Sequence, residues 1–222
     1  MKLSAHTMKR QLAQLLVLAA GLASLGAPAM AADLAAGKSL YATCAACHGA
    51  KAEGNPAVSA PNLSGQDAAY LLKQLQAFGA GARGAAADDR FGAQMRSASA
   101  AVLKSDADRA NVAAYIASLP AQRSPAKAGS SEVDLQLGQN YFNGICSACH
   151  SSSGKGNVSL GAPRLLGQDP AYLVRQYAAF KSGQRGGDPK DKPAKQMRGM
   201  TAALPDAKTE AAVLAYVARL PM

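Results

Sequence analysis

The chain has few of the residues that usually build a large core or a catalytic centre. Its 222 residues include no tryptophan, three histidines and four cysteines, and aromatic residues make up 5% of the total. A core built from this composition needs large apolar surfaces from another source. The net charge is +10, but the basic residues are dispersed and no nucleic-acid-binding motif is present. The sequence therefore predicts no nucleic-acid partner and a modest field that steers acidic partners.

The one long apolar run lies near the N-terminus, and residues 1–31 have the organisation of a secretory signal. Lys9 and Arg10 precede an apolar region over residues 12–25, and Ala29-Met30-Ala31 matches a small-residue cleavage site. The apolar region is too short to span a bilayer, although an uncleaved anchor is the alternative interpretation. The sequence predicts export to the periplasm, removal of the signal and a mature chain without a membrane anchor.

All four cysteines lie in two copies of one pentapeptide, C-x-x-C-H, over residues 44–48 and 146–150. C-x-x-C-H is the attachment signature of a c-type haem, in which both thiols form thioethers and the histidine ligates the iron. Cysteines three residues apart on a helical turn share one face, so both reach one porphyrin edge. The sequence predicts two haem c groups, attached at Cys44, Cys47, Cys146 and Cys149 and ligated by His48 and His150.

Three other uses of paired cysteines compete with haem attachment. Structural zinc requires four protein ligands, and catalytic zinc requires an open position, whereas each half offers two cysteines and one histidine. A disulfide or a redox dithiol fits an exported protein. Neither explains the adjacent histidine or its repetition, which favours haem.

The second half of the chain repeats the first at an offset of 102 residues. The segment P-x-L-x-G-Q-x-x-x-Y-L occurs at residues 61–71 and 163–173, and F-x-x-G-x-R occurs at residues 78–83 and 180–185. Residues 121–132 are rich in Pro, Ala, Gly and Ser and indicate a linker. The repeat predicts two duplicated domains, at residues 32–120 and 133–222.

Each repeat is expected to be all-α. Apolar spacing predicts helices over residues 33–46 and 66–78 and a last helix that begins at Ser105 or Asp106. The segment around Met95 has no apolar stripe and is interpreted as a polar loop.

The iron of each haem needs a sixth ligand, and neither half holds a second histidine for this role. Met95 aligns with Met197 without a gap, and Met200 is the rival in the second site. A His/Met pair saturates the iron, and the soft thioether favours Fe(II). Saturated iron predicts one-electron transfer rather than an enzyme such as a peroxidase, which needs an open iron and acid–base groups beside it.

Further repeated residues are candidates for contacts around each haem. The carbonyl groups of Pro61 and Pro163 are candidate acceptors for the second ring N–H of each ligating histidine. Candidate donors to the haem propionates are Tyr70, Arg83, Tyr172 and Arg185. The alternative is that the tyrosines pack between helices and the arginines are solvated.

With these residues in place, the chain resembles the dihaem cytochrome c4 family. The resemblance implies two tandem class I cytochrome c domains, each all-helical and wrapped around one covalently attached haem. It also implies a periplasmic carrier, often loosely associated with the membrane surface, that exchanges single electrons with redox proteins such as a quinol-oxidising complex and feeds a terminal oxidase. The alternative function is a cytochrome subunit that accepts electrons from a periplasmic dehydrogenase, for example a flavoprotein acting on sulfide or an alcohol dehydrogenase. The sequence departs from the family at residues 103–106 and 204–206, and the loop over residues 186–196 is rich in Lys, Asp and Pro.

Overall fold

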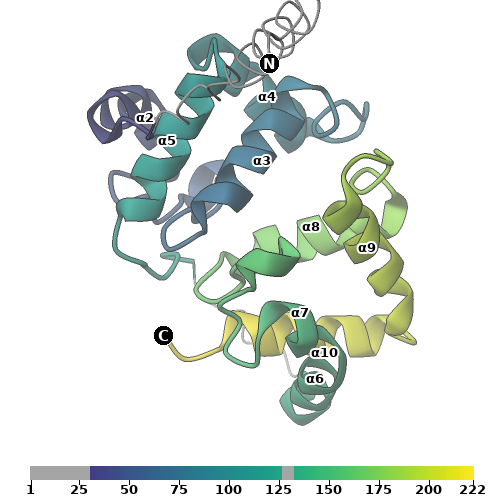
Figure 1. Cartoon of the computed structure of the whole chain (residues 1–222). Coiled ribbons are helices and arrows are strands. Elements are labelled where there is room, and N and C mark those ends of the chain that lie inside the picture. Colours follow the sequence, from purple (N-terminus) through teal and green to yellow (C-terminus); the bar gives the residue numbers. More distant parts are fainter. Residues whose placement is uncertain (1–30, 127–132) are drawn as a thin grey trace, which may run out of the picture. The chain divides into compact units, whose positions relative to one another are not determined.

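Helices in two successive sets form the described structure (Figure 1). The computed structural model describes residues 31–126 and 133–222, so the predicted signal lies outside the described residues except for Ala31. No strand occurs in these ranges, which confirms the all-α prediction. The first set, called the N-terminal domain, contains α2 (Leu34–His48), η1 (Pro56–Val58), α3 (Ala68–Gly79), α4 (Arg90–Val102) and α5 (Asp106–Ser118). The second set, called the C-terminal domain, contains α6 (Leu135–Tyr141), the π-helical segment η2 (Phe142–Cys146), α7 (Ser147–His150), η3 (Val158–Leu160), α8 (Pro170–Ser182), α9 (Lys192–Met200), η4 (Thr201–Ala203) and α10 (Ala207–Ala218).

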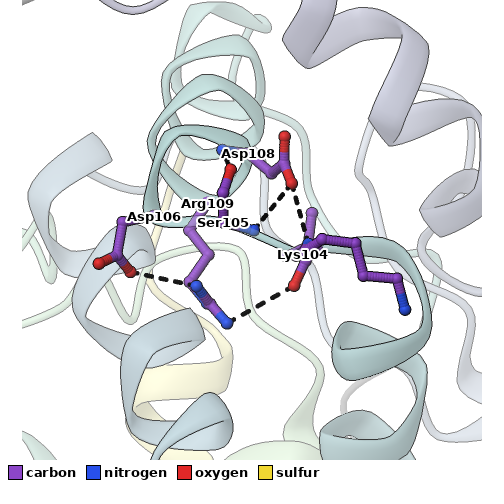
Figure 2. A network of polar contacts seen from close by, with 6 residues as sticks. Lys104, Ser105, Asp106, Asp108 and Arg109 are labelled. Carbon is purple, nitrogen blue, oxygen red and sulfur yellow. Dashed lines mark hydrogen bonds and ion pairs between the residues drawn. The ribbon is translucent and has the colours of Figure 1, made fainter.

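Polar caps define where the helices begin. Asp33 accepts hydrogen bonds from the first backbone N–H groups of α2, and Asp67 does the same for α3. Ser105 and Asp108 form a reciprocal capping box at the start of α5, in which each side chain accepts from the other residue's N–H (Figure 2). Each cap satisfies donors that have no partner inside the helix.

The first and last helices of each domain cross at a glycine. In the N-terminal domain α2 lies against α5, and Figure 1 shows the two helices side by side. A side chain at Gly37 would meet the backbone carbonyl of Asn111, so the helices approach backbone to backbone. Gly138 of α6 stands in the same relation to Ala212 of α10. This contact fixes α2, which carries the first C-x-x-C-H motif, and α6, which leads through η2 into the second.

Apolar side chains continue each crossing into a core. The Tyr41 and Tyr115 rings lie 5.5 Å apart in the N-terminal domain, and Phe142 and Tyr216 lie 5.7 Å apart in the C-terminal domain. Separate buried clusters surround the two pairs. Each domain therefore has its own core, although residues 32–222 form one unit.

The methionine segments differ from the prediction of a polar loop, which was wrong. Met95 lies inside α4, capped by Asp89, and Met197 lies inside α9, capped by Asp191. In α4, Phe91, Met95, Ala98 and Val102 recur at helical spacing, whereas the shorter α9 has no fully buried residue. The loop prediction overlooked this spacing in α4.

Candidate haem sites

Each C-x-x-C-H motif lies at the end of a helical segment. The first motif occupies the last turns of α2, and the second begins in η2 and ends with α7. All four cysteines are free thiols, so the disulfide alternative is not supported. Within the described ranges, no group of three or more His, Cys, Asp or Glu side chains is placed to hold a metal ion, so a zinc site has no ligand set there.

The two motif histidines are buried and held in one orientation by a backbone carbonyl. His48 Nδ1 lies 3.0 Å from the Pro61 oxygen, and His150 Nδ1 lies 3.0 Å from the Pro163 oxygen. A carbonyl can only accept, so Nδ1 carries the proton and Nε2 keeps the lone pair that binds a metal. Burial lowers the pKa of both histidines, which favours this neutral, ligating form.

Both motifs open onto one continuous cavity of about 490 Å³. Its lining is mostly apolar and comes from both domains. His48 and Met95 line it on the N-terminal side, and His150 and Met197 line it on the C-terminal side. Met200 also lines the cavity, but 38% of its surface is exposed. The histidine and the predicted methionine of each half thus face the same space.

Two arginines and two glutamines, one of each from either domain, form a closed ring of hydrogen bonds, called the arginine ring. Arg83 donates to Gln74 Oε1 at 2.7 Å and to Gln176 Oε1 at 3.1 Å. Arg185 donates to Gln176 Oε1 at 2.6 Å and to Gln74 Oε1 at 3.0 Å. Burial and the neighbouring Arg185 charge lower the pKa of Arg83. Burial alone would raise the pKa of Tyr172, but the charges of the two arginines outweigh it and lower that pKa.

This arginine pair tests whether haem fits the site. Arg185 is 6% exposed and Arg83 is partly buried, so the alternative of solvated arginines was wrong. Neither forms an ion pair with a carboxylate in the described part of the chain, and Arg185 Nε has no hydrogen-bond partner there. Two neighbouring guanidinium groups that are largely shielded from water and lack a carboxylate partner favour the binding of anions. Haem propionates are carboxylates, so the residues present fit this cofactor.

Four glutamines around the sites had no role in the prediction. Gln74 and Gln176 belong to the arginine ring, and Gln66 and Gln168 are buried between the domains. All four recur at the offset of 102 residues, and that recurrence was the available signal. Tyr177, which has no counterpart in the N-terminal domain, was also missed. Its hydroxyl donates to the Thr201 carbonyl at 3.0 Å, and burial followed by the nearby Glu210 charge raises its pKa to about 12.

A paired histidine and methionine facing one apolar cavity, beside an attachment motif and repeated in a second helical domain, define a c-type cytochrome with two haem sites. The cytochrome c family profile matches residues 34–120 and again residues 135–221. The chain therefore belongs to the cytochrome c family, in its dihaem cytochrome c4 branch. It carries two haem c groups and is an electron-transfer cytochrome.

Relatives of known name support this assignment. Cytochrome c4 of Azotobacter vinelandii is 34% identical over 167 residues, which are 71% of this chain and 77% of that protein. The thiosulfate dehydrogenase electron acceptor of Thiomonas intermedia (strain K12) is 34% identical over 206 residues, which are 90% and 89% of the two chains. The crystal structure of reduced recombinant cytochrome c4 from Pseudomonas stutzeri superimposes with a TM-score of 0.66 at 33% identity, covering 86% of this chain and all of that one.

Proposed function

We propose that this chain is a periplasmic carrier of single electrons between redox proteins, with a terminal oxidase as its acceptor. One observation carries the proposal: in each domain a buried, carbonyl-oriented histidine and a methionine face the same apolar space. When bound, haem supplies the exchange of one electron between Fe(II) and Fe(III). A histidine and a methionine that both ligated the iron would leave no position on it for a substrate, so the carrier role is proposed in place of an enzymatic one.

The proposed residue roles follow from position. The thiols of each C-x-x-C-H motif would hold the haem covalently, and His48 and His150 would ligate its iron. Met95 and Met197 would supply the second protein ligand of each iron. Met197 is proposed over Met200 because it pairs with Met95 at the repeat offset and is the less exposed of the two. Arg83 and Arg185, with the neighbouring Tyr70 and Tyr172, hold the propionates.

The domain boundaries and the location belong to the same proposal. We place the domains at residues 32–120 and 133–222, joined by a linker over 121–132 and preceded by a signal over 1–31. Ser124 N–H, in the described part of that linker, donates to the Gly167 carbonyl at 2.8 Å. In the described part of the chain no helix has the length and apolarity to cross a bilayer. A loose association with the membrane surface is part of the proposal, because it would bring the carrier near an oxidase.

A second function is favoured by one comparison. The Thiomonas relative that aligns over 206 residues is named as an electron acceptor of thiosulfate dehydrogenase. This chain could therefore accept electrons from a periplasmic dehydrogenase. Co-purification with a catalytic subunit at fixed stoichiometry supports the dehydrogenase role. Rapid oxidation by a terminal oxidase, without such co-purification, supports the carrier role.

A redox titration of the holoprotein tests the ligand assignment. Met95→His and Met197→His each replace a soft ligand by imidazole, so each is expected to remove one high-potential wave and leave the other. Met200→Leu is the matched control and is expected to retain both waves. If Met200→Leu loses the high-potential wave of the C-terminal haem and Met197→His retains it, the ligand is Met200 instead.

A further inference from the structure

Two glutamine side chains cross between the domains, and each binds one residue of the other domain twice. Gln66 Nε2 donates to the Arg164 carbonyl at 2.8 Å, and Arg164 N–H donates to Gln66 Oε1 at 2.8 Å. Gln168 Nε2 donates to the Asn62 carbonyl at 2.8 Å, and Asn62 N–H donates to Gln168 Oε1 at 2.9 Å. Both glutamines are 8% exposed, and the two pairs are related by the repeat offset of 102 residues.

The residues that they bind directly follow the prolines that orient the ligating histidines. The peptide group between Pro61 and Asn62 accepts from His48 Nδ1 at its oxygen and donates to Gln168 at its nitrogen. The peptide group between Pro163 and Arg164 likewise joins His150 to Gln66. One planar peptide unit therefore connects each histidine to a glutamine of the opposite domain.

We propose that Gln168 and Gln66 are positioning residues that tune the ligating histidine of the opposite domain through this shared peptide group. Hydrogen bonds in series polarise one another, so a peptide that donates at its N–H is a better acceptor at its oxygen. A better acceptor draws the Nδ1 proton and makes the imidazole a stronger electron donor. The inference rests on the proposed role of His48 and His150 as iron ligands.

The arrangement predicts a crossed effect. A stronger histidine donor favours Fe(III), so loss of the glutamine acceptor raises the potential of the haem in the other domain. Gln168 acts on the N-terminal haem and Gln66 on the C-terminal haem. Separation of the domains removes both contacts, so docking of the two domains holds both potentials down.

The experiment is a haem-resolved redox titration of full-length holoprotein carrying Gln168→Met or Gln66→Met. Methionine keeps the length of glutamine without its amide. Gln168→Met is expected to raise the Fe(II)/Fe(III) ratio of the N-terminal haem on the order of threefold at fixed ambient potential, through a hydrogen bond weakened by tens of per cent. At ~59 mV per tenfold change, this is roughly 30 mV. Gln66→Met is expected to shift the C-terminal haem instead, which makes each variant the control for the other.

A second readout is the exchange rate of each histidine Nδ1 proton, measured by NMR in the reduced protein. It is expected to rise at His48 in Gln168→Met and at His150 in Gln66→Met. Gln168→Glu keeps the acceptor oxygen and is expected to hold the N-terminal potential at or below that of the unchanged protein. It also serves as the test if Gln168→Met does not accumulate.

Equal shifts at both haems in each methionine variant, or a shift at the haem of the glutamine's own domain, would overturn the inference. Those outcomes leave the wild-type spectrum of histidine-ligated iron intact. Failure of the proposed function would instead appear in the unchanged protein, as iron that lacks histidine ligation.

Discussion

Replacement of Gly37 by alanine tests whether a backbone contact positions the helix of the first C-x-x-C-H motif. The new methyl group would meet the Asn111 carbonyl oxygen and carbon and would lie 2.9 Å from Tyr115 Cβ. The carbonyl is backbone and cannot rotate away. Helix α2 must therefore move away from α5, which also strains the hydrogen bond from Asp33 N–H to Asn111 Oδ1, now 2.9 Å.

The expected cost follows from two opposing terms. Overpacking of a well-packed contact costs about 1–3 kcal/mol, and a rigid obstacle places this contact in the upper part of that range. Alanine in a helix interior returns up to about 1 kcal/mol relative to glycine. The expected net loss is about 1–2 kcal/mol, which lowers Tm by about 2–8 °C in a chain of this size.

The measurement is thermal unfolding of the ferric holoprotein, followed by circular dichroism. Gly144→Ala is the matched control, because a side chain at Gly144 meets nothing within 4 Å. That control is expected to melt at or above the temperature of the unchanged protein. If Gly37→Ala melts as Gly144→Ala does, the helix crossing is not limited by backbone contact and the reasoning is refuted.

Three further predictions concern the α5 cap and the arginine ring. Ser105→Ala is expected to cost about 1 kcal/mol in thermal unfolding, because it removes the side-chain acceptor of the capping box, whereas Ser105→Asp retains one. Hydrogen bonds from the Ser105 hydroxyl and N–H lower the pKa of Asp108, so its contribution to stability is present above the usual aspartate pKa and is lost as the pH falls through the lowered value. Acid unfolding curves of Asp108→Asn are expected to lose that component, and an unchanged curve would contradict the assignment. Arg83→Leu removes a cation that is proposed to bind the propionates and is expected to lower a haem potential, whereas Lys38→Leu, which changes an exposed cation on α2, is expected to leave both potentials in place.

Helix positions could be predicted where side chains of the chain itself provide the packing. The apolar spacing over residues 66–78 predicts a helix, and the structure has α3 there. The prediction succeeds because the spaced residues Leu71, Leu75 and Phe78 are all buried. The spacing in the last helix of the first repeat indicates α5 for the same reason, since Val112 and Ile116 are buried. In these helices the period of the sequence matches the period of the contacts.

The methionine helices were not predicted in this way. Met95 and Met197 lie on helices that line the cavity, and a cofactor that fills a cavity is not encoded as residues of the sequence. Asp89 and Asp191 are the remaining local signals, as caps at the start of α4 and α9. In α4 the apolar residues Phe91, Met95 and Val102 have helical spacing but line the cavity, so the group they face lies outside the chain, and α9 has no fully buried residue.

The contacts between the domains show why the repeated polar residues matter together. A two-fold relation makes an interface self-complementary, so a contact from residue i to residue j is accompanied by one from j to i. The arginine ring follows this rule, because Arg83 and Arg185 each bind both Gln74 and Gln176. A sequence repeat therefore predicts that each site occurs twice. Which residues of one repeat bind which residues of the other can be read only from the structure of the interface.

The symmetry is broken at the edge of this interface. Lys73 forms an ion pair with Asp191 of the other domain at 2.9 Å. Arg175 matches Lys73 at the repeat offset, yet it donates to the Ser59 carbonyl at 2.9 Å and lies over the Phe91 ring at 4.6 Å. The cation that contacts the C-terminal domain, Lys73, is thus paired with a carboxylate, whereas the cation that contacts the N-terminal domain, Arg175, lies on an aromatic ring. Two haem sites built from the same motif consequently lie in unequal electrostatic surroundings, and the inequality comes from the contacts between domains rather than from the ligands.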